Sequence, residues 1–170
     1  MAYGVVRTDL MFGTEVGSGL ASVKYMGADG QTETEIQNGS VLKLGGLMTG
    51  EREVYVGGAV AANDEVKDVV LVASPEVAYD ERKRNLDQYI NEAGKIVRGY
   101  HFHTNDVFSV TKDVLDGKAS PAVNDIVEFK AGTKLNVAGT SATSGSTVLG
   151  KIIAVDNVGR YTYYAIRVTA

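Results

Sequence analysis

The sequence predicts a mainly β protein, a β-barrel or sandwich with hairpins, with one short helix near residues 81–93. The chain has 170 residues, of which 44% are hydrophobic and 22% charged, so it has enough apolar material for a packed core. It contains 20 Gly and only 2 Pro, and its turns must therefore depend on Gly, Asn and Asp, as in hairpin-rich folds. Short alternating segments recur at intervals of roughly 8–12 residues, which is typical of sandwiches and barrels rather than parallel α/β sheets.

Period-two alternation and turn residues locate the individual strands. Asn38-Gly39 predicts a type I′ hairpin turn, in which both central residues need positive φ. Val66–Ala73 is the strongest strand candidate of the first half, and its five-residue apolar run Val69–Ala73 predicts a buried strand. The other predicted strands are Ser22–Met26, Val41–Leu44, Glu53–Val56, Val107–Thr111, Asp125–Lys130, Lys134–Ala138, Thr147–Asp156 and Tyr161–Thr169.

One segment carries a helical pattern instead. Between residues 80 and 94, four apolar residues fall at positions i, i+3, i+4 and i+7 and form a single stripe. Asp80 can cap the start of this helix, and Gly94 stands where a left-handed residue would end it. The stripe consists of Leu86, Tyr89, Ile90 and Ala93.

These patterns divide the chain into four parts, which can also form one continuous domain. Residues 1–20 are Gly-studded without a clean period and are expected as an N-terminal arm, or equally as a frayed end with an edge strand. Residues 21–75 form a β-rich N-terminal half and residues 76–95 a helical connector. Residues 96–170 form a C-terminal β-barrel-like half.

Composition argues against several classes of partner. The formal net charge is -4, and the densest basic run, Arg82-Lys83-Arg84, is flanked by acidic residues, so nucleic acid is not expected as a partner. The absence of Cys excludes disulfides and thiolate metal sites. No apolar stretch approaches the roughly 20 residues that span a bilayer, and the N-terminus does not resemble a signal peptide. We therefore expect synthesis in a cytoplasm and no membrane partner.

The search for catalytic chemistry finds little. His101 and His103, separated by Phe102, would point to the same side of a strand and could share a metal with Asp106 or with a carboxylate from elsewhere in the chain. Without a third ligand at a diagnostic spacing, two exposed polar residues flanking an inward Phe102 is the favoured interpretation. No nucleophile elbow or phosphate-binding loop occurs. We expect no enzyme activity, no catalytic residue and no cofactor.

The second half of the chain resembles a known class of virion protein. The residues concerned are Tyr79–Lys95, Arg98-Gly99-Tyr100 and Asn105–Val110. They are similar to a segment of the capsid decoration, or cement, proteins of tailed phages that infect Gram-positive bacteria. The resemblance covers roughly residues 70–170 and includes no catalytic motif, and no functional residue can be carried over from it.

The resemblance implies a structural protein of the capsid exterior, made in the bacterial host cytoplasm. Such proteins bind the major capsid protein lattice of an expanded head, here as a homo-oligomer with a trimer favoured. Many have an N-terminal arm that becomes ordered on the shell. The expected capsid-binding residues in that arm are Tyr3, Val5, Val6, Arg7, Leu10, Met11 and Phe12.

Two other functions remain open from the sequence. A tail-tube or other virion subunit would combine a β-sandwich, one helix and long hairpins in the same way. A carbohydrate-binding adhesin module would use exposed Tyr faces, and Tyr161 and Tyr163 share one face of the last predicted strand. Cross-strand packing is the favoured use of those two tyrosines.

Overall fold

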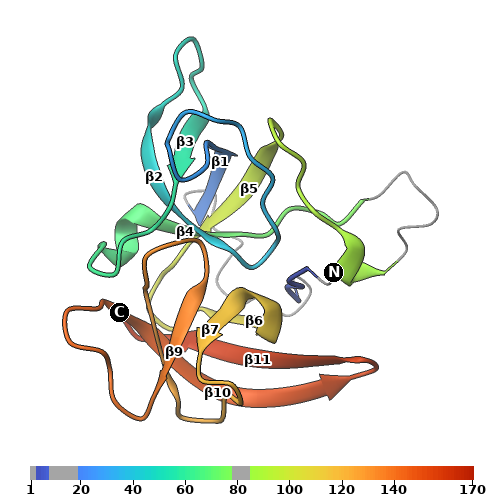
Figure 1. The fold of residues 1–170 in the computed structure, drawn as a ribbon, viewed down its shortest axis with the longest axis vertical. Helices are drawn as coiled ribbons and strands as arrows, with labels where there is room; N and C mark the ends of the chain where they lie inside the picture. The colour runs from blue at the N-terminus through green and yellow to red at the C-terminus, as the bar shows by residue number, and fades with distance from the viewer. Residues whose placement is uncertain (1–2, 8–18, 78–84) are drawn as a thin grey trace.

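The computed structural model describes residues 3–7, 19–77 and 85–170, and within them the chain is mainly β, as the sequence predicted. The first unit is a closed five-stranded barrel, seen in the upper part of Figure 1. Its strand order is β1-β3-β2-β4-β5, and β1 pairs with β5 to close the ring. The strands are β1 (Leu20–Tyr25), β2 (Val41–Leu47), β3 (Val54–Gly58), β4 (Val69–Val72) and β5 (Ile96–His101).

The second unit is a six-stranded sheet, drawn below the barrel in Figure 1. Its order is β6-β11-β10-β8-β9-β7, with the long hairpin β10–β11 near its centre. The strands are β6 (Val107–Thr111), β7 (Leu115–Gly117), β8 (Ile126–Glu128), β9 (Leu135–Gly139), β10 (Val148–Val158) and β11 (Tyr161–Val168). Strand β5, which the sequence grouped with the C-terminal half, instead pairs with β1 and β4 of the barrel.

Strand β4 explains why the apolar run Val69–Ala73 has no alternation. Val70 and Val72 point into the barrel interior, whereas Val69 and Leu71 join a larger core that continues into the second sheet. All four residues are buried. A strand covered on both faces needs apolar residues at every position. The first part of the predicted strand, Val66–Asp68, forms a 3-10 turn, η3.

The barrel interior is so narrow that strand β5 has a glycine, Gly99, where it packs against the neighbouring strands. A Cβ at Gly99 of β5 would lie 2.8 Å from Val70 Cγ2 and 3.1 Å from Val23 Cγ2. Side chains of the valines therefore fill the space that a residue 99 side chain would need.

Residues 3–7 lie along the edge strand β6. Val6 forms a bridge with Val110, Thr111 N–H donates to Val5 C=O over 3.1 Å, and Arg7 N–H donates to Ser109 C=O over 3.1 Å. This short segment covers the free edge of β6, which would otherwise expose unpaired backbone groups.

The predicted helix near residues 81–93 is reduced to a 3-10 turn, η4 (Leu86–Gln88), in the part of it that is described. Tyr89 has extended dihedral angles, and Asn91 pairs with Ile36 in an antiparallel bridge. The Asn91 side chain also donates to Ile36 C=O over 3.0 Å. These tertiary hydrogen bonds outweigh the weak intrinsic preference of a short amphipathic helix. Gly94 does have positive φ, but in a turn, and Asp80 lies outside the described residues.

The prediction of a type I′ turn at Asn38-Gly39 is wrong. Gly39 has a φ of 83°, but Asn38 does not have positive φ and is fully buried. Its carboxamide donates to Ser74 C=O over 2.9 Å and accepts from Ser74 N–H over 3.0 Å and from Asn91 Nδ2 over 3.0 Å. We call Asn38, Ser74 and Asn91 the amide hub, because they join three separate chain segments by side-chain hydrogen bonds.

Candidate functional site

The two histidines do not form a metal site with the described residues. His101 pairs with Val70 within the barrel, while His103 lies beyond the end of β5 and is exposed. His103 is linked to Asp106 by a backbone N–H bond of 3.0 Å and by a 3.4 Å contact between Nδ1 and Oδ2. Phe102 is buried and packs against Phe108, whereas His101, which was expected to be exposed, is half-buried. Among the described residues, no three His, Asp or Glu side chains gather where they could bind a metal ion.

Two buried carboxylates have structural partners instead of a catalytic arrangement. Asp125 is held by Lys118 Nζ at 2.8 and 2.9 Å and by Ala122 N–H at 2.7 Å. Burial alone would raise the pKa of Asp125, but these hydrogen bonds outweigh it and leave the pKa below its ordinary value.

Glu128 shows the same balance on strand β8. Its two oxygens accept from Asn136 Nδ2 and Thr143 N–H, each over 2.8 Å. Burial would raise the pKa of Glu128, and the bonds from Thr143 and Asn136 lower it overall. Both oxygens are thereby committed to a loop and a neighbouring strand, which is the geometry of a structural carboxylate.

The expected capsid-binding residues of the arm divide into three groups. Val5 and Val6 are buried within the chain itself. Tyr3 and Arg7 are half-buried, and the Arg7 guanidinium lies 5.5 Å above the Tyr163 ring. The remaining residues, Leu10, Met11 and Phe12, lie outside the described part of the chain.

The tyrosine face of β11 is largely covered. Tyr163 is buried beneath Arg7, and its ring centroid lies 6.0 Å from that of Tyr161. Tyr161 in turn lies under the Arg160 guanidinium at 5.0 Å, and its hydroxyl donates to Asp87 over 3.1 Å. The two rings therefore pack against each other and against cations, which leaves Tyr163 unable to stack on a sugar.

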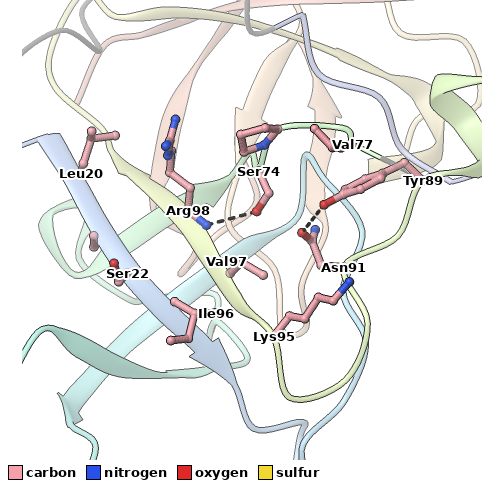
Figure 2. Close-up of a pocket in the computed structure, with 12 residues that line it drawn as sticks. Leu20, Ser22, Ser74, Val77, Tyr89, Asn91, Lys95, Ile96, Val97 and Arg98 are labelled. Atoms are coloured by element: carbon pink, nitrogen blue, oxygen red, sulfur yellow. Dashed lines mark hydrogen bonds between the residues drawn. The ribbon is translucent and has the colours of Figure 1, made fainter. Parts of the chain in front are cut away.

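A groove on the outer face of the barrel brings several exposed apolar side chains together. We call it the β1–β5 groove; its volume is about 610 Å³. Figure 2 shows its floor on β1 and β5 and its wall at Ser74, Val77 and Tyr89. Three apolar side chains at the groove are strongly exposed: Leu20 by 43%, Ile96 by 56% and Val77 by 63%.

The groove combines this apolar surface with basic side chains and a wall held by hydrogen bonds. Lys95 and Arg98 both line it; Lys95 forms an ion pair with Glu92 over 3.0 Å, whereas Arg98 has no ion-pair partner among the described residues. Arg98 N–H donates to Ser74 Oγ over 3.1 Å, and Tyr89 hydroxyl donates to Asn91 Oδ1 over 3.2 Å. Both bonds are drawn in Figure 2, and they connect the groove to the amide hub. Such a surface suits a partner that has apolar and acidic side chains.

The sequence search did not find this groove. Ile96 and Val97 are adjacent apolar residues, and the sequence does not show which of them faces outward. In the barrel, Ile96 lies opposite Lys24 of β1 and is the exposed one. Leu20 and Ile96 are far apart in the chain, and no motif joins them. The exposed partners could be identified only from the register of the closed barrel.

No helix in the described part of the chain is long and apolar enough to cross a membrane. Comparison of the chain with protein-family models, with curated proteins and with solved structures gave no match.

Proposed function

We propose that this protein is a virion structural protein that binds the outer surface of a tailed-phage capsid and stabilises the expanded shell. It would be made in the cytoplasm of the bacterial host and would act without an enzymatic activity or a cofactor. Its partner would be the major capsid protein lattice, which it would bind as a homo-oligomer, with a trimer favoured.

One observation carries the proposal. The segment that resembles capsid decoration proteins supplies four residues of the β1–β5 groove, namely Tyr89, Asn91, Lys95 and Arg98. The segment that carries the resemblance therefore lines the same groove that exposes apolar side chains. We assign the groove, in place of Val5 and Val6, as the contact with a capsid segment of apolar and acidic character.

The architecture supports a clamping role in physical terms. Two β units share one hydrophobic core, so that a load applied to the barrel is transmitted to the second sheet through packed side chains. A decoration protein stabilises a shell by RT ln(1 + [L]/Kd) for each site, and it gains nothing by changing shape on binding. A rigid β body with a preformed groove meets that need at low entropic cost.

The test is co-sedimentation of the purified full chain with expanded, decoration-free heads of the phage that encodes it. We expect saturable binding and a higher melting temperature of the heads. Replacing Ile96 by Glu should weaken binding at least about tenfold, because it puts a charge into an apolar contact. The control is Val123→Glu, an exposed apolar residue that does not line the groove.

Two outcomes would count against the proposal. If the chain does not bind expanded heads, the decoration role fails. If electron microscopy instead shows the chain in polymerised tubes or hexameric rings, a tail-tube subunit becomes the better assignment.

A further inference from the structure

A second cavity lies where residues of the barrel, of the N-terminal segment and of the second sheet meet. It has a volume of about 480 Å³, within the usual size range of small-molecule sites. Tyr3 and Tyr25 both line it, and we call it the Tyr3–Tyr25 cavity. It shares no lining residue with the β1–β5 groove.

Several polar groups that line this cavity retain hydrogen-bonding capacity. Gln37 Oε1 accepts from Gly4 N–H over 2.8 Å, while the two N–H donors of the same carboxamide have no partner among the described residues. Glu35 and Lys134 likewise have no ion-pair partner in the described part of the chain. Ser40, also at the cavity, holds a buried Oγ that none of the described protein atoms satisfies. The protein itself covers this oxygen, so the polar groups that can face a ligand are those of Gln37, Glu35 and Lys134.

The charges around the cavity balance. Glu35 and Asp113 contribute two carboxylates, while Lys112 and Lys134 contribute two ammonium groups. Lys112 Nζ already donates to Leu115 C=O over 2.6 Å, and Asp113 accepts from the Thr111 hydroxyl. A site for phosphate or for a cation would carry an excess of one sign. This lining instead favours a neutral ligand.

The two tyrosines add flat apolar surface and hydroxyl groups. The Tyr25 hydroxyl is protonated at neutral pH and can donate a hydrogen bond, and burial, followed by the charge of Asp29, raises its pKa further. A ligand that matches the lining must be neutral, must donate and accept many hydrogen bonds, and must present apolar faces to aromatic rings. Sugars meet all three conditions, because ring C–H groups lie between hydroxyls.

We propose that the Tyr3–Tyr25 cavity is a binding site for a neutral saccharide. Sugar hydroxyls donate to Glu35 and accept from Lys134 and Gln37, while the tyrosine rings cover the C–H faces. The cavity is separate from the groove assigned to the capsid, so this inference does not rest on the capsid role and can fail or succeed independently.

The test is a titration of the ¹⁵N-labelled full chain, followed by NMR, with glucose, galactose and N-acetylglucosamine in turn. We expect at least one of them to cause saturable shifts of the amides of Thr34, Gln37 and Thr133, which line the cavity. Inorganic phosphate, tested in the same way, should cause none. The inference is overturned if none of the three sugars saturates these shifts, or if phosphate does so.

Matched variants give the second measurement. Tyr25→Ala should weaken sugar binding about tenfold, since it removes a stacking surface, whereas Tyr25→Phe should retain most of the affinity. Tyr55→Ala, on an exposed tyrosine outside the cavity, should leave the affinity unchanged. If Tyr25→Ala does not fold, Glu35→Gln, at an exposed position, takes its place with the same expected direction. Equal affinities in the cavity variant and in Tyr55→Ala would overturn the proposal.

Discussion

Replacing Asn38 by alanine tests whether the amide hub holds the barrel to the segments on either side of the groove. The substitution removes two hydrogen bonds to the backbone of Ser74 and one from the side chain of Asn91. Asn38 and Asn91 are almost completely buried, so water cannot readily replace the lost partners. A longer contact of 3.4 Å to Glu76 is lost as well.

The expected cost is about 3 kcal/mol of unfolding free energy. A typical intramolecular hydrogen bond contributes about 1 kcal/mol net, and a buried group left without a partner costs at least as much. For a chain of this length, a loss of about 3 kcal/mol lowers the melting temperature by roughly 6–12 °C. Asn38→Asp should be at least as damaging, because it removes the donor to Ser74 and buries a charge.

Urea unfolding followed by circular dichroism measures this cost. The control is Asn157→Ala on the β10–β11 hairpin, where an exposed asparagine accepts a single bond from Thr162; its expected cost is below about 0.5 kcal/mol. A double-mutant cycle between Asn38 and Asn91 should show a coupling energy of about 0.5–3 kcal/mol. A cost for Asn38→Ala below about 1 kcal/mol, or additive effects in the cycle, would refute the reasoning.

Three further predictions follow from single contacts. Gly99→Ala should destabilise the barrel by about 1–3 kcal/mol in urea unfolding, because its Cβ would overlap Val70; an unchanged midpoint would contradict the close approach. Arg160→Ala should free Asp87 from its ion pair and raise hydrogen exchange in the 85–88 turn, with little change in global stability. The Asp125 pKa lies below its ordinary 3.8, so this residue's stabilisation is present above that value and is lost as the pH falls through the lower folded-state pKa. Asp125→Asn should therefore flatten the acid branch of the stability curve below about pH 5, and an unchanged branch would contradict this.

Much of the strand pattern could be predicted from the sequence because local alternation reports which face of a strand is buried. The strands predicted at Val107–Thr111 and Tyr161–Thr169 correspond to β6 (Val107–Thr111) and β11 (Tyr161–Val168). The alternation of residues within a strand does not indicate, however, which strands pair to close a barrel. Nothing near Ile96 in the sequence indicates that β5 returns to pair with β1, and this pairing closes the barrel.

The failures at Asn38-Gly39 and near residues 85–93 have one common cause. Asn-Gly favours a hairpin turn locally, and the spacing of Leu86 and Tyr89 favours a helix locally. The amide hub offers Asn38 and Asn91 a set of buried hydrogen bonds to each other and to Ser74, which neither local structure could provide. Two asparagines 53 residues apart in the chain therefore override two local preferences at once.

The same hub also determines how firmly the β1–β5 groove is shaped. Ser74 belongs to the groove wall, accepts from Arg98 N–H of the floor, and bonds Asn38 behind it. Asn91, which belongs to the same hub, accepts a hydrogen bond from the Tyr89 hydroxyl. A change at Asn38, which does not line the groove, should therefore lower partner affinity through loss of groove order, whereas a change at Ile96 should lower affinity without loss of stability. Measuring partner affinity and unfolding free energy for both variants distinguishes a preformed groove from one that its partner shapes. If Asn38→Ala loses stability and keeps full affinity, the partner orders the groove, and the rigid clamp inferred above is incorrect.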